Sequence, residues 1–380
     1  MNVSVYDSLQ ALPSGYARLF DDWSTVSYNY SLPWFQNLVE TAIEPHYRVR
    51  LFGLEVPDRA RTPVAILPAK FESRPAGLLE PRRLSALGNY YSSLFGPMID
   101  RTVADRVGAL DALVDALCQD RPQWDIIDLT PMDRDAPLYT ELQAALQRRG
   151  LIVQPYRAFG NWYLEVGGRS YAEYVKGLPS VLKKNIPYYT RKLHKSFQAR
   201  LDLITTSDGI DEALQAYDTV YRKSWKLPEP HPHFIPGLAR TALKNGWLRL
   251  GIAYLDGTPA AAQLWFVHAG IASIFKVSYD ERFAKHSVGT VLTGKIMEHV
   301  LDIDKVHTVD FLSGDDSYKK HWMSHRRERW GLYAMNPRTF NGCLSVLRHV
   351  GGRAVSSLLA AMRPTPPAPA EQANSASETA

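Results

Sequence analysis

A chain of 380 residues is longer than most single compact domains, so two domains are the starting expectation. Apolar residues make up 45% and charged residues 22%, a composition that excludes disordered and fibrous proteins. The net charge is +5, and the two cysteines, Cys118 and Cys343, exclude a disulfide framework. Neither a secretory signal nor an apolar run of roughly 18 residues is present, so we expect a cytoplasmic protein.

In chain order, the first half contains a strand, a polar turn and a second strand over residues 47–71. The same pattern returns over residues 247–270, and both turns end in Thr-Pro. Later in each half an amphipathic helix precedes a short strand with an internal Asp, WDIIDL at 124–129 and HTVDFL at 307–312. Two pairs in the same order predict two homologous α/β units in tandem.

The second unit can be followed element by element. We expect a strand at 201–206, a helix at 211–225, three strands ending near residue 280, a helix at about 289–301 and a strand ending at Leu312. A short helix around Tyr318 and a strand at 327–337 complete the unit. The segment 227–236 contains four prolines and is predicted to be a loop.

These patterns divide the chain into four parts. Residues 1–165 form an N-terminal unit, expected to be degenerate, and residues 166–340 form the second unit with a basic helical segment at 171–198, which Pro187 interrupts. Residues 341–363 have helical amphipathic spacing, which indicates either packing on their own domain or attachment to a membrane surface. The Pro- and Ala-rich tail at 364–380 is predicted to be disordered.

Three stretches carry a resemblance to a known family: AAAQLWFVHAGIASIFKVSYDERFAKHSVGTVLTGKIMEHVLD, VDFLSGDDSYKKHWMSHRRERWGLYAMNP and, more loosely, GNYYSSLFGP at 88–97. The chain resembles bacterial acetyltransferase-like proteins of the CelD (cellulose biosynthesis) type, which are related to FemAB transferases and the GNAT superfamily. The resemblance is dense from about residue 162 to 337. It implies an α/β (α+β) fold of tandem GNAT-like units, whose mixed sheets splay open between the fourth and fifth strands to admit acyl-CoA.

The resemblance also implies a donor site at the start of the helix near residue 289. Unpaired N–H groups there would hold the pyrophosphate, with Lys276 on the strand alongside. The loop residues that we predict for this role are Ser287, Val288, Gly289 and Thr290. The family pattern has Gln or Arg, two residues, Gly, one residue, then Gly or Ala, whereas this chain has His286, Gly289 and Val291. A plain helix cap by Ser287 is the alternative.

Transfer from a thioester to an amine needs a deprotonated amine, a stabilised oxyanion and an acid for the thiolate. We predict Tyr318 as the acid, because many GNAT enzymes place a Tyr beside the sulfur. Asp310 and Asp315 are predicted as catalytic carboxylates that deprotonate or hold the ammonium group. Alternatively, Asp315 and Asp316 cap the helix that carries Tyr318.

Further candidates for substrate binding follow from the strands and loops around the predicted split; these are Tyr279, Gln263, Asp316, Lys319 and Tyr90. An inward Lys276 is costly to bury without an anionic partner, although alternation along the strand could turn it to solvent. The pairs His231 with His233 and His321 with His325 lack a third ligand, so we expect no metal.

We therefore expect an acyl-CoA-dependent N-acyltransferase that acts on an amine of a glycan precursor or an amino lipid, in peripheral contact with the inner membrane. One alternative is a FemAB-like transferase that uses aminoacyl-tRNA. The lack of a long heptad-bearing segment for tRNA disfavours it, and we expect no DNA partner. The other alternative is a non-catalytic binding protein in exopolysaccharide biosynthesis.

Overall fold

The computed structural model describes residues 2–56, 62–73, 77, 79–121 and 123–349. The predicted tail at 364–380 lies outside this part of the chain, as does most of the predicted amphipathic helix at 341–363. The described portion of that segment is helical from residue 340 to residue 349.

The described strands form one 13-stranded mixed sheet in the order β1-β2-β3-β4-β6-β13-β7-β12-β11-β10-β9-β8, with β5 paired to β3. The strands are β1 (Asn2–Tyr6), β2 (Tyr47–Glu55), β3 (Pro63–Glu72), β4 (Arg83–Ala86), β5 (Met98–Ile99), β6 (Ile126–Asp133), β7 (Ile152–Glu165), β8 (Ala199–Ile204), β9 (Leu248–Leu255), β10 (Thr258–His268), β11 (Ile271–Tyr279), β12 (Thr308–Asp310) and β13 (His325–Met335).

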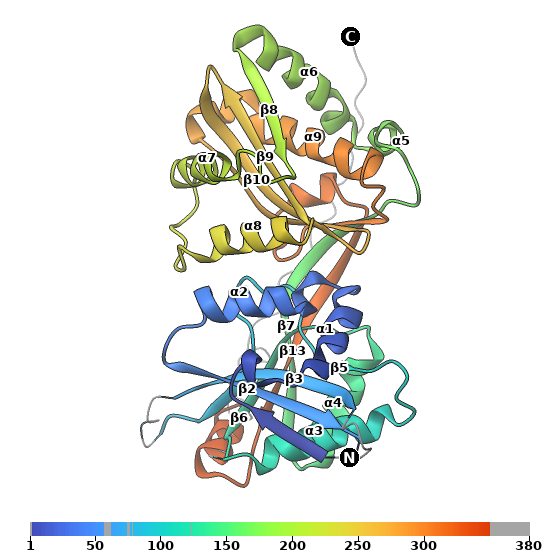
Figure 1. Ribbon diagram of the computed structural model, residues 1–380, viewed down its shortest axis with the longest axis vertical. Helices are drawn as coiled ribbons and strands as arrows, with labels where there is room; N and C mark the ends of the chain where they lie inside the picture. The colour runs from blue at the N-terminus through green and yellow to red at the C-terminus, as the bar shows by residue number, and fades with distance from the viewer. Residues whose placement is uncertain (1, 57–61, 74–76, 78, 122, 350–380) are drawn as a thin grey trace, which may run out of the picture.

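Helices cover this sheet and fill the space between its two halves (Figure 1). The α-helices are α1 (Ala17–Ser24), α2 (Leu32–Ala42), α3 (Arg106–Gln119), α4 (Pro137–Arg148), α5 (Tyr171–Gly177), α6 (Ser180–Ser196), α7 (Ile210–Arg222), α8 (Phe234–Lys244) and α9 (Val288–Asp302). The short 3-10 helices are η1 (Leu9–Ala11), η2 (Ser14–Tyr16), η3 (Tyr28–Tyr30), η4 (Glu281–His286) and η5 (Lys319–His321).

The two halves repeat the same order of elements. The first unit runs β1, α1, α2, β2, β3, β4, α3, β6, and the second runs β8, α7, α8, β9, β10, β11, α9, β12. In both, three antiparallel pairings are followed by one parallel pairing, β4 with β6 and β11 with β12. The predicted fold class, tandem GNAT-like units with mixed sheets, is confirmed.

The last strand of each unit is exchanged between the halves. The sequence would place β7 in the first unit and β13 in the second, yet β13 lies between β6 and β7, and the end of β7 pairs with β12. The two strands run side by side from one half to the other (Figure 1). Each unit therefore needs a strand from the other to complete its part of the sheet.

An aromatic core joins the halves beside these strands. Helix α2 of the first unit packs on α8 of the second, and the ring of Trp34 meets the ring of Phe234 edge to face at 5.7 Å. Trp34 and Phe234 are both fully buried. Burial of such large apolar side chains holds the two units in one orientation.

Two local predictions were wrong, and both concern proline. Helix α8 begins at Phe234, so the predicted loop ends before Pro236, which sits in the first helical turn where its missing N–H costs nothing. Helix α6 runs from Ser180 to Ser196 with Pro187 inside it, without the expected interruption. Its apolar side packs on α9, which supplies contacts that compensate for the lost helical hydrogen bond.

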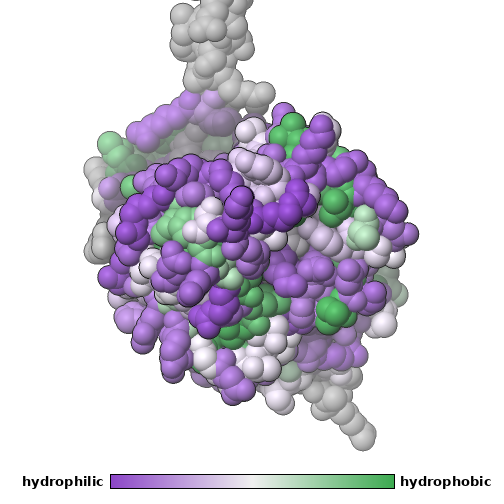
Figure 2. Space-filling view, turned by 90° about the horizontal axis from the view of Figure 1, so that it is seen from above, coloured by the Kyte–Doolittle hydropathy of each residue, from purple (hydrophilic) through white to green (hydrophobic). Residues whose placement is uncertain are grey.

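Within the described residues, no helix combines the length and apolar character needed to cross a bilayer. Figure 2 looks onto the end formed by the second unit and shows mostly hydrophilic side chains, with apolar ones in small separate patches.

Candidate functional site

The second unit contains the predicted split in its sheet. Strands β11 and β12 pair at only three positions, the last joining Ser273 to Asp310. Beyond them β11 continues to Tyr279, whereas β12 ends at Asp310 and the chain turns away. The strands part where GNAT-like geometry predicts an opening, between Lys276 and the segment that follows Asp310.

A cleft of about 210 Å³ occupies this split. Five of the predicted residues line it: Tyr90, Lys276, Asp316, Tyr318 and Lys319. They come from a loop of the first unit, from β11, and from the segment between β12 and β13. The cleft is therefore built by both units.

Tyr318 lies at the edge of the cleft, immediately before η5. Its ring packs edge to face on Phe311 at 5.8 Å, and 42% of its surface is exposed. Burial, with a smaller contribution from Asp316, raises the pKa of the Tyr318 hydroxyl well above its usual value. The group therefore stays protonated at neutral pH, as an acid must before it donates.

Lys319 lines the same cleft, and its ammonium group is held in place. Its side chain is 7% exposed, and Nζ donates to the carbonyl oxygen of Ser313 at 2.7 Å and lies 3.1 Å from Asp316. Burial lowers the pKa of Lys319, and hydrogen bonding to Asp316 opposes this shift. A cation held in this way can stabilise an oxyanion that forms in the cleft.

Lys276 points inward and has an anionic partner that the sequence did not reveal. The carboxylate of Glu229, from the Pro-rich segment, accepts from Lys276 at 2.6 Å, from Tyr90 at 2.7 Å and from Tyr91 at 2.5 Å. Burial alone would raise the pKa of Glu229, but hydrogen bonds from Lys276 and Tyr91 lower it to about 2. These hydrogen bonds to Glu229 join the two units at the mouth of the cleft.

Lys226, three residues before Glu229, also lines the cleft. Burial and the nearby Lys276 lower its pKa to about 8. Among the described residues, no hydrogen bond or ion pair is formed by its ammonium group; the nearest aromatic rings, Trp225 and Tyr221, are 5.8 and 5.9 Å away.

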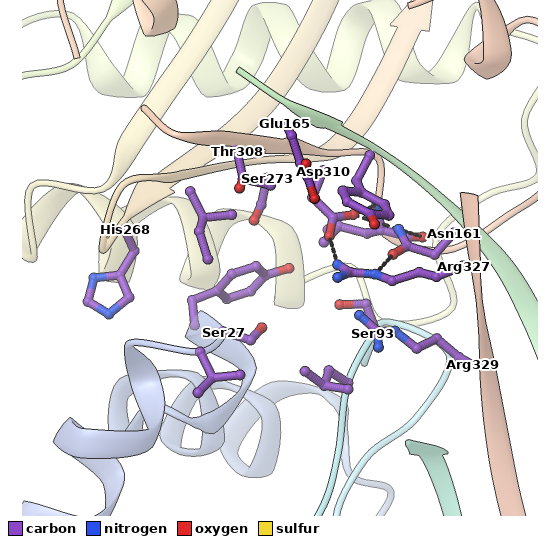
Figure 3. Close-up of a pocket in the computed structure, with 16 residues that line it drawn as sticks. Ser27, Ser93, Asn161, Glu165, His268, Ser273, Thr308, Asp310, Arg327 and Arg329 are labelled. Carbon is purple, nitrogen blue, oxygen red and sulfur yellow. Dashed lines mark hydrogen bonds and ion pairs between the residues drawn. The ribbon is translucent and has the colours of Figure 1, made fainter. Parts of the chain in front are cut away.

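Asp310 faces away from the cleft, into a separate cavity of about 230 Å³ between the two units (Figure 3). Its Oδ1 accepts from the N–H of Leu312 and from Asn161, both at 2.6 Å, and its Oδ2 accepts from Arg327 at 2.5 Å. Asn161 also donates to the carbonyl oxygen of Leu312 at 2.6 Å. The network therefore holds both sides of Leu312, whose φ of +55° is strained for a residue with a side chain.

The carboxylate of Asp315 lies outside the cleft, where two arginines and a tryptophan donate hydrogen bonds to it. It accepts from Arg326 at 2.6 Å, from Arg157 at 3.1 Å and from the indole N–H of Trp162 at 2.8 Å. Hydrogen bonds from Arg326 hold the pKa of Asp315 well below its usual range. Of the three predicted carboxylates, Asp316 is the one that lines the cleft.

The predicted phosphate loop leads into α9 at the end of β11. Ser287 has a φ of +53°, and its side chain makes no capping hydrogen bond, so the alternative of a plain Ser cap does not apply. Within the described part of the chain, the N–H groups of Val288, Gly289 and Thr290 have no hydrogen-bond acceptor. Lys285 precedes this turn, so the start of α9 offers free donors and positive potential.

The remaining predicted residues, Gln263 and Tyr279, pack beside this turn. Gln263 is buried and donates to the carbonyl oxygen of Gly289 at 3.0 Å and to the hydroxyl of Thr293 at 2.8 Å. Tyr279 packs against Trp225 with 4.7 Å between ring centroids. A Cβ added to Gly289 would meet the Tyr279 ring at 3.3 Å, so this position requires a small residue.

The first unit contains a second split with the same register. Strands β4 and β6 pair at three positions, the last joining Ser85 to Asp128, and a cavity of about 890 Å³ opens beyond them. Asp128 accepts from the hydroxyl of Tyr156 at 2.7 Å, and burial raises its pKa. Tyr90 lines both this cavity and the cleft, and so does Ser313.

Sequence reasoning missed Lys226, Glu229, Tyr91 and Asp128. A Lys and a Glu within a run of prolines were a usable signal, because prolines fix a loop in which polar groups can be positioned. Among the described residues, no group of three His, Cys, Asp or Glu side chains is arranged to hold a metal ion.

Comparisons with known proteins agree with this geometry. A family model described as "Acetyltransferase (GNAT) domain" matches residues 180–320. No curated protein matches the chain. The structure is similar to that of FemX, with a TM-score of 0.61 at 10% identity, covering 91% of this chain and 99% of that one.

Two further solved structures are similar over nearly the whole chain. One is a conserved protein of unknown function from Bacteroides thetaiotaomicron VPI-5482, with a TM-score of 0.55, 9% identity, and coverage of 88% of this chain and 100% of that one. The other is a tandem GNAT protein from the clavulanic acid biosynthesis pathway, with a TM-score of 0.51, 11% identity, and coverage of 89% and 100%. At these identities the likeness shows the fold. With the GNAT domain match, it indicates that the chain is an acyltransferase.

Proposed function

We propose that the chain transfers an acyl group from acyl-CoA to an amine, with the donor in the split of the second unit and the acceptor approaching from the first. The observation that carries this proposal is the opening between β11 and β12, with Tyr318 and Lys319 on its wall and the uncapped start of α9 at the end of β11. The donor phosphates would bind the N–H groups of α9, and the thioester would lie in the cleft.

The proposed chemistry begins with the Tyr318 hydroxyl in its protonated form. The amine attacks the thioester carbon, and the developing oxyanion is stabilised by the ammonium group of Lys319. When the C–S bond breaks, the Tyr318 hydroxyl gives its proton to the departing thiolate. The new amide nitrogen then releases a proton, which restores the tyrosine. Asp316 is positioned to hold the incoming ammonium group, which releases its first proton to solvent before it attacks.

The acceptor would occupy the larger cavity of the first unit. That cavity of about 890 Å³ reaches Tyr90 and Ser313, the residues it shares with the cleft. A glycan precursor or an amino lipid fits a cavity of this size better than a small amine does.

For such acceptors we place the reaction in the cytoplasm, at the inner face of the membrane. Helix α6 supports this location because it exposes several cations, among them Lys183, Lys184, Arg191 and Lys195. Exposed cations on one helix are attracted to anionic lipid head groups.

An aminoacyl-tRNA donor is the second candidate, favoured by the similarity to FemX and by the same basic helix. Both donors would present an activated acyl carbon to the same cleft. A direct comparison therefore separates them.

The test incubates the protein with acetyl-CoA and longer acyl-CoA donors, offers a panel of amino sugars and amino lipids, and follows free thiol. We expect amine-dependent thiol release and CoA binding by calorimetry. Absence of both with every donor would refute acyl-CoA dependence. Transfer from aminoacyl-tRNA under the same conditions would establish the second candidate instead.

A further inference from the structure

The charges of the cleft in the second unit do not balance. Three ammonium groups line it, those of Lys226, Lys276 and Lys319. Lys276 is matched by Glu229 at 2.6 Å, and Lys319 is matched by Asp316 at 3.1 Å. Among the described residues, two carboxylates therefore form ion pairs with two of these three lysines. The lysine without an ion-pair partner is Lys226.

The position of Lys226 makes this imbalance costly. Lys226 is half-buried, and its charged neighbours Lys276 and Lys319 repel it. Glu229 attracts it, but the oxygens of that carboxylate are already taken by Lys276 and by two tyrosines. A partly desolvated cation without a bonded anion is stabilised when a ligand brings one.

We propose that Lys226 binds an anionic group, a carboxylate or a phosphate, that the acceptor carries near its reactive amine. This inference rests on the proposed function and adds the substrate class. Neutral amines would leave Lys226 unpaired in the complex, so the cleft discriminates against them. Lys226 is then a specificity-determining residue.

The surroundings of Lys226 assign the anion to the transfer end of the cleft. The charged groups that act on it are Lys276, Glu229, Lys319 and Asp316. Three of these, Lys276, Lys319 and Asp316, line the same cleft as Tyr318. The lysines that act on His286, beside α9, are instead Lys285 and Lys192. The donor phosphates therefore have their own cations. The charge at Lys226 is available to the acceptor or to an acidic acyl chain.

The experiment measures transfer to matched acceptor pairs: glucosamine 6-phosphate with glucosamine, and β-alanine with its carboxamide. Acetyl-CoA and succinyl-CoA serve as donors. We expect the wild type to prefer the anionic member of at least one pair. Lys226→Met should lower kcat/KM for that member about 10- to 100-fold, mainly through KM, with little change for the neutral member.

Two control variants separate charge from structure. Lys226→Arg keeps the charge and should retain most of the preference. Lys244→Met removes an exposed lysine at the end of α8 and should leave both members of each pair unaffected. Thermal unfolding of each variant establishes that it is folded.

The outcomes distinguish this inference from the proposed function. Equal use of neutral and anionic acceptors, unchanged in Lys226→Met, would overturn the inference while acyl transfer stands. A loss in Lys226→Met confined to succinyl-CoA would assign the anion to the donor and reject the acceptor role. If no pair is acylated, calorimetry of glucosamine 6-phosphate decides: equal binding, or none, by wild type and Lys226→Met would also refute the inference.

Discussion

The two splits of the sheet have the same register but different side chains around them. In the first unit Ser85 stands opposite Asp128 at the last paired position, and in the second unit Ser273 stands opposite Asp310. The surroundings of the two carboxylates differ, since Asp310 is held by Arg327 and amide donors whereas Asp128 meets a tyrosine hydroxyl. The two splits therefore share their backbone register, and we expect the side chains around each one to determine what it binds.

The helices that follow the splits differ in the same way. At the start of α3, the side chain of Asp105 accepts from the N–H of Gly108 at 2.8 Å, so a carboxylate occupies the position that an anionic ligand would need. At the start of α9, Ser287 makes no such bond. The comparison therefore predicts that donor phosphates bind the second unit and not the first.

The largest expected effect comes from removing the predicted acid of the second split. Tyr318→Phe should lower kcat about 100-fold or more, because the thiolate then departs without a proton. Tyr188→Phe, on the exposed face of α6, is the matched control and should be unaffected. Steady-state kinetics with acetyl-CoA measures both, and an unchanged kcat would remove Tyr318 from the mechanism.

The next largest effect tests the hydrogen-bond network of Asp310 that holds Leu312. Asp310→Ala leaves Arg327 and the N–H of Leu312 without their acceptor, which should cost about 2 to 4 kcal/mol of unfolding free energy. We expect kcat to fall about tenfold, while the pH profile keeps its shape because Asp310 positions the segment and exchanges no proton. A profile that loses its acidic limb would instead identify Asp310 as the general base, because that limb reports the protonation of the base.

A smaller effect follows from making α9 resemble α3. Ser287→Asp would place a carboxylate beside the free N–H groups, stabilise the helix through its dipole by about 0.5 kcal/mol and raise the KM for acyl-CoA about tenfold through repulsion of the phosphates. The reciprocal variant Asp105→Ala should lose about 1 kcal/mol without a change in KM. If Ser287→Asp binds acyl-CoA as tightly as the parent does, the donor site is not at this turn.

The smallest effect concerns the pH dependence of stability in the first unit. Burial raises the pKa of Asp128 in the folded state, so its protonated form favours folding. That contribution is fully present below the unfolded pKa and is lost as the pH rises through the folded pKa. Asp128→Asn should therefore be more stable than the parent at pH 7, by about 1 kcal/mol or less, and this advantage should vanish near pH 4. Thermal unfolding at both pH values checks the sign.

The sequence was most informative where the repeat was visible. The paired motifs WDIIDL and HTVDFL predicted two equivalent strands, and the structure confirms their register down to Asp128 and Asp310. The start of α9 was also placed within one residue. Both predictions depend on the local spacing of apolar residues, which can be seen in a single sequence.

The surroundings of individual side chains could not be predicted in the same way. Asp310 and Asp315 lie in one short segment of the sequence. Their partners come from the exchanged strands: Asn161 and Arg157 from β7, and Arg327 from β13. No local pattern reports that these strands pass between the units. For the same reason Glu229 was read as part of a loop, although it meets Tyr90 from the other unit.

The exchange of β7 and β13 has a consequence for how the chain is made. Strand β6 pairs with β13, which begins at His325, so a nascent chain that ends before this residue cannot finish the sheet of the first unit. During synthesis, the first unit must wait until β13, which ends at Met335, has left the ribosome. Stalled nascent chains ending at residue 300 should therefore be cleaved within residues 126–165 by a protease that spares the released protein.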